Sequence, residues 1–325
     1  MAAKRAAARR LLGQAEPPVR LGPLSASLDP RHNVVGVGAG GKITKGRLTG
    51  TPCIRLYVER KVERRAVPAG LLLPVTIEGF PTDVVETGRF VALPARLPVA
   101  RRRLRPARPG CSMGFRFTGD RVDLVMAGTF GAVVQADGRR CILSNNHVLA
   151  DENNLPVGSP VFQPGVLDGG SPARDRIATL TRFIALARDG PNSVDAALAE
   201  VLDPRAVRAA FLPKVGRLGS ASPVRAVEGM RVHKHGRTTG YTTGRVFDAS
   251  ADVTVRYEMG VLAFEDQVLI QGDRGMFSDS GDSGSVIVDR ATKRAAALLF
   301  AGSRSYTIAN RLSEVLSRLG VAMVV

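Results

Sequence analysis

The sequence is poor in cysteine and has no long apolar run. Its three cysteines, Cys53, Cys111 and Cys141, are an odd number and none stands in a C-x-x-C pair, which disfavours a disulfide framework and a zinc–cysteine site. No stretch approaches the roughly 18 uninterrupted apolar residues of a transmembrane helix, so no membrane partner is expected. The basic start lacks the apolar segment of a secretory signal. These absences favour a reducing, cytoplasmic location.

Acidic residues are scarce in the first third of the chain. Residues 1–110 carry 21 Lys and Arg against 7 Asp and Glu, whereas residues 111–325 carry 25 against 22. Basic clusters of this kind can contact nucleic acid or an acidic partner. However, no aromatic residues interleave with them, as single-strand binding would require. A solvated tail and linker is the favoured interpretation, and nucleic acid stays an alternative partner that is not favoured.

Composition divides the 325 residues into regions. From about residue 121, short runs rich in Val, Ile, Leu and Thr alternate with Gly, Pro, Asp and Asn, which is typical of an all-β sandwich or a pair of barrels. Asp137-Gly138 between two such runs predicts a hairpin turn. We expect a basic flexible arm over 1–24, a small α/β domain over 25–95, an Arg- and Pro-rich linker over 96–120 and a β-rich domain over 121–325.

One amphipathic helix is expected near the C-terminus. Leu312, Val315, Leu316 and Leu319 follow the i, i+3, i+4, i+7 spacing of a helix face, and Gly320 supplies a stop signal. The spacing predicts a helix over 310–320.

Three short motifs carry candidate chemistry. Gly281-Asp-Ser283-Gly-Ser has glycines around a serine, which allow a tight turn whose amides could face an oxyanion. Such a serine needs a base to take its proton. His147 ends a β-like run, and Asp195 begins an apolar run in which a buried carboxylate would need a cation or hydrogen-bond donors. Each motif alone is weak evidence for catalysis.

The three residues are more informative together. Their order is His147, Asp195, Ser283, with gaps of 48 and 88 residues. The chymotrypsin order is the same, with gaps of roughly 45 and 93. Over about residues 121–325 the sequence therefore resembles the trypsin-like serine peptidases.

The resemblance is closer to one group, the narrow-leaf (Nal1-like) trypsin-like peptidases. It rests on six segments and on an N-terminal module that starts near residue 30. The segments are Pro109-Gly-Cys-Ser, Ala127-Gly-Thr-Phe-Gly, Leu143-Ser-Asn-Asn-His-Val-Leu-Ala, Gln163-Pro-Gly-Val-Leu-Asp-Gly-Gly, Val194-Asp-Ala-Ala and Gly236-Arg-Thr-Thr-Gly. The resemblance implies a mainly β protein with a double β-barrel, its first barrel over about 121–205 and its second over about 212–309. It also implies an intracellular serine endopeptidase that acts on a protein or peptide substrate and forms homo-oligomers.

The same resemblance implies roles for individual residues. Ser283 would be the nucleophile, His147 the general base and acid, and Asp195 the group that orients the histidine, with the amides of Gly281 and Ser283 as the oxyanion hole. Phe277 would form the floor of the substrate pocket, which predicts a small or medium apolar residue before the cleaved bond. Phe300, Ala301 and Gly302 would pair with the substrate backbone as an added strand.

The sequence departs from the secreted trypsins near the nucleophile. About 120 residues precede the first barrel, so no free N-terminus is expected to reach Asp282. Asp282 then needs another partner or stays solvated, and activation by cleavage of a precursor is disfavoured.

Other motifs have simpler interpretations. Gly36-Val-Gly38-Ala-Gly-Gly41-Lys42 resembles a phosphate loop, but no helix pattern follows, so a glycine-rich hairpin is favoured. His233 and His235 lack nearby carboxylates or cysteines and are read as one strand face. Asp168-Gly-Gly is read as a turn. No metal and no cofactor are predicted.

Two other functions remain open. The chain could be a catalytically weak or inactive oligomeric scaffold on the same fold, because a fold never proves a function. It could also be a nucleic-acid-associated protein that works through its basic arm and linker.

Overall fold

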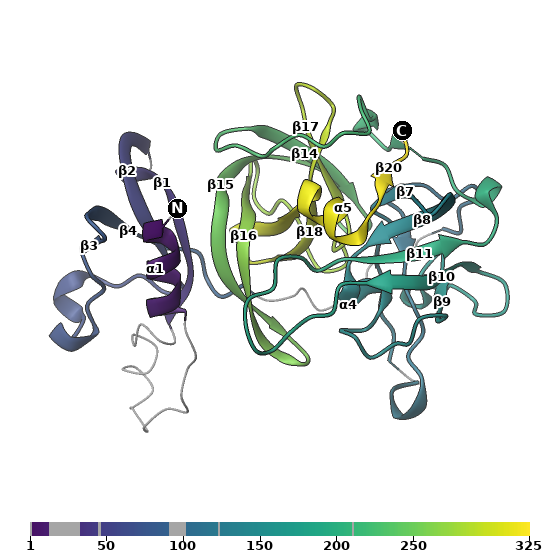
Figure 1. Cartoon of the computed structure of the whole chain (residues 1–325), viewed down its shortest axis with the longest axis horizontal. Coiled ribbons are helices and arrows are strands. Elements are labelled where there is room, and N and C mark those ends of the chain that lie inside the picture. The colour runs from purple at the N-terminus through teal and green to yellow at the C-terminus, as the bar shows by residue number, and fades with distance from the viewer. Residues whose placement is uncertain (1, 13–32, 45–46, 91–101, 123, 210) are drawn as a thin grey trace.

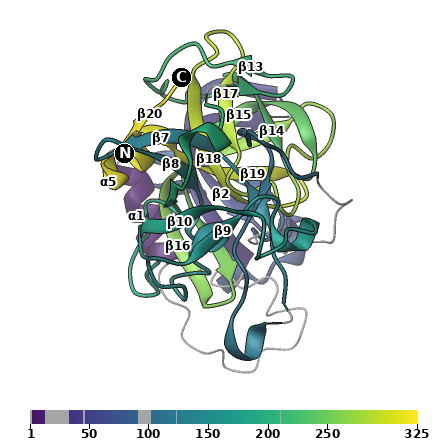
Figure 2. The same cartoon turned by 90° about the vertical axis from the view of Figure 1, so that its right-hand side faces the viewer.

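The structure is a computed structural model that describes residues 2–12, 33–44, 47–90, 102–122, 124–209 and 211–325. Strands dominate these residues, and the elements form three groups in a row along the longest axis (Figure 1). Among the described residues, those numbered 86 or lower lie at one end, those from 231 to 311 in the middle and those from 132 to 201 at the other end, which faces the viewer in Figure 2.

The N-terminal group is a helix packed on a small sheet. Strand β1 pairs antiparallel with β2, and β2 pairs parallel with β4. Strand β1 also pairs with a strand of the middle group, through Gly36–Val253 and Val37–Asp252. The elements are α1 (Ala2–Leu11), β1 (Val34–Thr44), β2 (Arg47–Val58), the 3-10 turns η1 (Arg64–Ala66) and η2 (Ala69–Leu71), β3 (Thr76–Ile77) and β4 (Phe80–Glu86).

Helix α1 corrects the expectation of a flexible arm over residues 1–24. Alanine is the best helix former, and Ala3 and Ala7 pack with residues of β1 and β2 in a buried cluster. The ammonium of Lys4, 1% exposed, lies 2.9 Å from Asp252 and 3.0 Å from Asp266. These buried contacts fix residues 2–11, and residues 13–24 lie outside the described residues.

The first barrel is a six-stranded antiparallel sheet in the order β20–β7–β8–β11–β10–β9. As predicted, Asp137 and Gly138 join β7 to β8 in a two-residue turn, with φ of 48° and 77°, the left-handed values that a type I′ turn requires. The strands are β7 (Ala132–Ala136), β8 (Arg139–Ser144), β9 (Pro160–Phe162), β10 (Arg176–Phe183), β11 (Ala197–Val201) and β20 (Ala322–Met323).

The second barrel closes on itself. Its order is β14–β17–β18–β19–β16–β15, and β15 pairs back with β14. Strands β15 and β16 are long and form a hairpin that extends beyond the barrel (Figure 1). The strands are β14 (Arg231–Gly236), β15 (Gly240–Tyr257), β16 (Gly260–Gly272), β17 (Val286–Asp289), β18 (Ala295–Gly302) and β19 (Tyr306–Arg311).

Short elements lie around and between the barrels. The helix expected over 310–320 is α5, and its apolar side chains are buried among residues of both barrels. Gly320 ends it with a φ of 65°. The elements are β5 (Ser112–Met113), η3 (Gly119–Arg121), β6 (Gly128–Thr129), α4 (Asn146–Leu149), η4 (Val166–Asp168), η5 (Pro204–Ala206), β12 (Phe211–Leu212), β13 (Gly216–Arg217) and α5 (Leu312–Leu319).

The second half of the expected linker is packed rather than solvated. Arg103 donates to Asp175 at 2.6 Å, and Arg105 donates to the Gln163 side chain at 2.5 Å. Ala107 forms a bridge with Val207. Residues 102–120 thus line the first barrel because their cations find acceptors there, and residues 96–101 lie outside the described residues.

The predicted class, mainly β with two barrels behind a small helix-and-strand region, is confirmed. Among the helices that the structure describes, none is long and apolar enough to cross a membrane.

Candidate active site

His147 and Asp195 meet at the edge of the first barrel. His147 stands on α4, the single helical turn that follows β8, and Asp195 stands just before β11, which pairs with β8. The Nδ1 atom of His147 is 2.5 Å from Oδ2 of Asp195. The carboxylate is fully buried, whereas the imidazole side chain is 11% exposed. The Nδ1 side of the imidazole is therefore bound by a carboxylate inside the protein.

Four donors hold the Asp195 carboxylate. Its Oδ1 accepts the backbone amides of Asn146 at 2.7 Å and His147 at 3.3 Å. Its Oδ2 accepts the Tyr257 hydroxyl at 2.8 Å in addition to the imidazole. This arrangement satisfies a buried charge with hydrogen bonds, which is what a carboxylate at 0% exposure requires.

Two opposing effects act on the pKa of His147. Burial alone would lower it, because burial disfavours the charged ring. The charge and hydrogen bond of Asp195, with a smaller contribution from Glu152, outweigh burial and raise the pKa above its ordinary value. The imidazole therefore holds a proton more readily than a free histidine does.

Ser283 lies in the loop between β16 and β17, on the second barrel. Its side chain is almost fully buried, and its Oγ donates to the Phe300 carbonyl at 3.3 Å. Among the described residues, no hydrogen bond joins this hydroxyl to His147. The structure thus holds the Ser283 hydroxyl on the Phe300 carbonyl and away from the imidazole.

The serine loop and the histidine helix nevertheless face the same glycine. A methyl group added at Gly128 would lie 2.6 Å from the side chain of Val148, the neighbour of His147, and 3.1 Å from the Ser283 carbonyl oxygen. The Thr129 amide donates to that same carbonyl at 2.8 Å. Only a residue without a Cβ allows the two segments to approach this closely.

Two backbone amides of the Ser283 loop are unengaged. Within the part of the chain that the structure describes, the N–H groups of Gly281 and Ser283 have no hydrogen-bond partner. Gly281 has a φ of 87°, in the left-handed region that favours glycine. The carboxylate of the next residue, Asp282, points into the second barrel, where it accepts a hydrogen bond from Lys234. The loop can therefore present two donors to an oxyanion.

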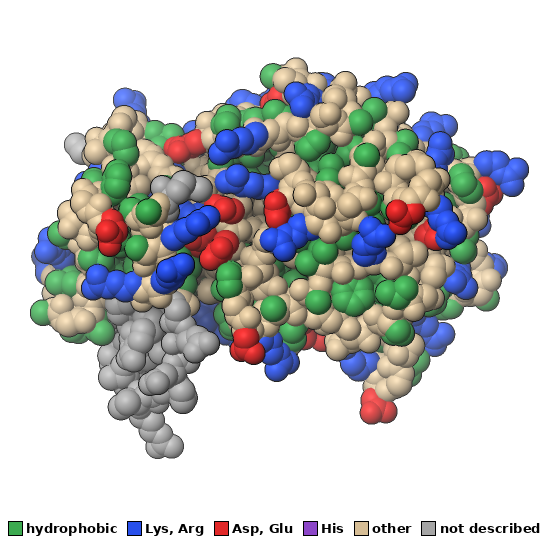
Figure 3. All heavy atoms as spheres, in the orientation of Figure 1, with side chains coloured by type: hydrophobic (Ala, Val, Ile, Leu, Met, Phe, Trp, Pro, Cys, Tyr) green, Lys and Arg blue, Asp and Glu red, His purple; other side chains and the backbone are tan. Residues whose placement is uncertain are grey.

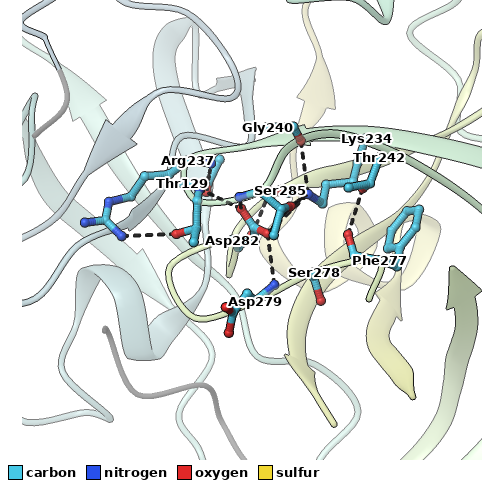
Figure 4. A network of polar contacts seen from close by, with 12 residues as sticks. Thr129, Lys234, Arg237, Gly240, Thr242, Phe277, Ser278, Asp279, Asp282 and Ser285 are labelled. Carbon is cyan, nitrogen blue, oxygen red and sulfur yellow. Dashed lines mark hydrogen bonds and ion pairs between the residues drawn. The ribbon is translucent and has the colours of Figure 1, made fainter. Parts of the chain in front are cut away.

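The buried carboxylate of Asp282 has a buried cation, Lys234, as its partner (Figure 4). Its Oδ2 lies 3.2 Å from the ammonium of Lys234, and both side chains are fully buried. Its Oδ1 accepts the amides of Thr238 at 2.8 Å and Thr239 at 3.1 Å. The Asp279 amide also donates to Oδ2, at 3.1 Å. Lys234 of β14 is thus the cation that pairs with Asp282, which the sequence analysis did not expect a free N-terminus to reach.

A second buried ion pair lies beneath the same loop. Arg237 donates to both carboxylate oxygens of Asp168, at 2.6 and 2.8 Å, and both side chains are fully buried. A methyl group on Gly281 would lie 2.2 Å from the Arg237 guanidinium. This pair joins the Asp168-Gly-Gly segment of the first barrel to the Gly236-Arg-Thr-Thr-Gly segment of the second, so Asp168 is more than a turn residue.

The residues predicted for the substrate pocket divide into two groups. Phe277 is 2% exposed and packs in the core of the second barrel, where its ring meets Lys234. The ring thus fills the barrel, and its role as the floor of a substrate pocket stays a prediction. Phe300, Ala301 and Gly302 end β18 beside Ser283, as their predicted role requires.

Sequence reasoning missed Lys234, Arg237 and Tyr257. The signal for Arg237 is the cation inside the glycine-bounded segment Gly236-Arg-Thr-Thr-Gly, which could have suggested a partner for Asp282 or Asp168. Tyr257 had no such signal, because a tyrosine in a strand is ordinary. Within the described residues, no cluster of three His, Cys, Asp or Glu could hold a metal ion.

Comparisons with known proteins agree with the resemblance seen in the sequence. The Nal1 C-terminal domain family matches residues 198–306. The rice (Oryza sativa subsp. japonica) Protein NARROW LEAF 1 is 27% identical over 285 residues, covering 79% of this chain and 48% of the rice protein. The chain thus spans about half the length of that relative. The predicted resemblance to the Nal1-like proteins is confirmed.

Solved serine proteases are similar at lower identity. A glutamic acid specific serine protease is 19% identical with a TM-score of 0.47, covering 67% of this chain and 100% of that chain. Thermobifida fusca Protease A is 16% identical with a TM-score of 0.46, covering 67% of this chain and 99% of that chain.

Proposed function

We propose that the chain is a serine endopeptidase that cleaves a protein partner through a Ser-His-Asp acyl-enzyme mechanism. The observation that carries the proposal is the buried Asp195 carboxylate bound to His147 Nδ1, which leaves Nε2 as the ring nitrogen available to a substrate-side group. A histidine oriented in this way is the general base that a serine nucleophile needs.

The first step requires one rearrangement. The Ser283 hydroxyl must leave the Phe300 carbonyl, to which it donates at 3.3 Å, and turn toward His147 Nε2. His147 then takes the hydroxyl proton while Oγ attacks the scissile carbonyl carbon. The protonated ring gives that proton to the leaving amine, and an acyl group stays on Ser283. Water, deprotonated by the same ring, hydrolyses the ester and restores the serine.

The carbonyl oxygen gains negative charge in this step and needs donors. The unengaged amides of Gly281 and Ser283 would stabilise it. Because the turn that presents them is fixed by Asp282, they need little reorganisation when the charge forms, which is the source of most of their effect. Removing one such donor typically costs about 100- to 1000-fold in rate.

The substrate backbone would add as a strand to the end of β18. Among the described strands, β17 pairs with β18 only as far as Val286–Leu298. Phe300, Ala301 and Gly302 follow on that edge, so an extended peptide could lie beside them. A Cβ at Gly302 would lie 3.1 Å from the Tyr306 carbonyl oxygen and 3.6 Å from the Ser278 hydroxyl, which is itself 2.6 Å from the Thr307 hydroxyl.

A cytoplasmic location and protein partners belong to the same proposal. The three cysteines are free thiols, which suits a reducing compartment. Basic and acidic side chains are interspersed on the face shown in Figure 3, rather than gathered in one basic patch of the kind that nucleic acid prefers. Assembly with further copies of the chain is proposed from the resemblance alone.

The test is covalent labelling by a fluorophosphonate probe, which reacts with an activated serine. We expect the full chain to be labelled and Ser283→Ala to lose all labelling while it keeps the wild-type circular dichroism spectrum. Ser112→Ala is the matched control, because it removes another buried serine hydroxyl, one that accepts the Gly165 amide at 3.1 Å. Wild-type protein that is never labelled between pH 6 and 9 would refute the proposal.

One observation favours the second candidate, an oligomeric scaffold with a weak or inactive site. Ser283 Oγ bonds to the Phe300 carbonyl, not to the imidazole. If that orientation persists when a peptide is present, the serine stays unactivated. The labelling experiment separates the two candidates, because an unactivated serine would not react with the fluorophosphonate probe.

A further inference from the structure

Tyr257 of the second barrel donates a hydrogen bond to Asp195 of the first barrel. The Tyr257 hydroxyl is 2.8 Å from Asp195 Oδ2, and the side chain is 5% exposed. Its ring meets the His147 ring edge-on, with centroids 5.9 Å apart and an interplanar angle of 71°. Burial and the Asp195 charge raise the pKa of Tyr257 well above its ordinary value, so the phenol stays protonated and donates.

The geometry of the hairpin explains how this contact is held. Tyr257 is the last residue of β15, and the tip that follows it leads into β16. Glu152 of the first barrel accepts the tip amides of Glu258 at 3.0 Å and Met259 at 2.8 Å. Arg121 donates to Glu258 at 2.8 Å and to Asp151 at 2.7 Å. The hairpin tip that directly follows the tyrosine is thus anchored on the first barrel.

We propose that Tyr257 is a positioning residue that sets the basicity of His147 by holding Oδ2 of Asp195. The inference rests on the proposed function, because it gives a role in the same triad. Asp195 Oδ2 is shared between the imidazole and the phenol. Every donor that binds a carboxylate spreads its charge and leaves less of that charge to stabilise a neighbouring cation. Removing the phenol therefore leaves more of the Asp195 charge for the imidazolium.

The direction in which Tyr257→Phe shifts the pKa of His147 follows from the charged groups around the ring. The charged groups that face His147 are Asp195 and Glu152, and Glu258 at the hairpin tip is paired with Arg121. None of these is changed by Tyr257→Phe, which keeps the ring and removes only the hydroxyl. The pKa of His147 then rises further, and the ring becomes a base only at higher pH.

The test compares Tyr257→Phe with wild type by the rate of fluorophosphonate labelling from pH 5 to 9. We expect the midpoint of the acid limb to move up by about half to one pH unit, which slows labelling about three- to tenfold below the midpoint. The matched control is Tyr57→Phe, which also breaks a bond between a buried tyrosine and a buried aspartate, Asp248, but lies away from the triad. It should lower stability without moving the midpoint.

A second measurement does not depend on labelling. The Nδ1 proton of His147 gives a downfield proton resonance whose titration reports the pKa of the ring, and the same upward shift is expected there in Tyr257→Phe. Unchanged midpoints in both measurements, with wild type labelled, would overturn the role of Tyr257 alone. Absent labelling in wild type would instead overturn the proposed function.

Discussion

The buried pair of Lys234 and Asp282 makes a quantitative prediction. Its Nζ–Oδ2 distance is 3.2 Å and neither side chain is exposed. Removing one partner of a buried ion pair leaves an uncompensated charge and costs roughly 3–5 kcal/mol. Lys234→Met keeps the length of the side chain but leaves Asp282 with amide and hydroxyl donors only. Because those donors remain, we expect a loss near the lower bound, about 3 kcal/mol.

The pair itself is expected to add little net stability. Burial lowers the pKa of Lys234 despite the opposing charge and hydrogen bond of Asp282, so the folded protein disfavours the ammonium relative to the unfolded chain. Well-packed neutral replacements of buried pairs are often neutral or stabilising. The double variant Lys234→Met with Asp282→Asn should therefore recover part of the loss, by about 2 kcal/mol relative to the sum of the single variants.

Urea unfolding of the two single variants, the double variant and wild type measures this cycle. Arg290→Met, which removes an exposed cation at the end of β17, is the control and should change the free energy of unfolding by less than about 0.5 kcal/mol. The labelling rate at Ser283 should fall in both single variants, since the loop that carries the Gly281 and Ser283 amides loses its anchor. A Lys234→Met protein with less than about 1 kcal/mol of destabilisation and unchanged labelling would refute the reasoning.

Two further predictions concern pH. His147 must be neutral to act as a base, and its pKa is raised, so the labelling rate should climb through a midpoint above about pH 6.5; a flat rate across pH 6–8 would contradict this. The stability that His147 contributes is present below its unfolded pKa and is lost as pH rises through the folded one. His233 behaves oppositely: burial lowers its pKa to about 4, so stability should fall by about 2–3 kcal/mol between pH 6.5 and 4, and His233→Phe should flatten that decline in urea unfolding.

Local sequence patterns were sufficient to predict the helix α5 and the turn at Asp137-Gly138. The heptad-like spacing at Leu312, Val315, Leu316 and Leu319 produces α5, because those four side chains share one side of a helix and enter the core between the barrels. Asp137-Gly138 produces its turn because both positions need positive φ. In each case the signal lies within a few residues, so the local sequence pattern alone decides the outcome.

The sequence is least informative where a residue far along the chain determines the local structure. The basic composition of residues 2–11 suggested a solvated arm, but Asp252 and Asp266, more than 240 positions away, bind Lys4 and turn a charge into a buried contact. The direction of the Phe277 ring likewise depends on a distant residue, Gly244, which leaves room for the ring inside the barrel. Offsets along the chain fix where a backbone runs and leave open which side of it a side chain takes.

The same distinction explains why the candidate site was only half visible. His147, Asp195 and Ser283 are chemically reactive types, so order and spacing reveal them. The groups that hold them, Lys234, Arg237 and Tyr257, are ordinary residues whose roles exist only after two barrels and a hairpin meet. Each of them joins segments at least 48 residues apart, and each satisfies a carboxylate that is fully or almost fully buried. A buried carboxylate in a sequence therefore implies a partner of known chemistry at an unknown position, and the fold supplies the position.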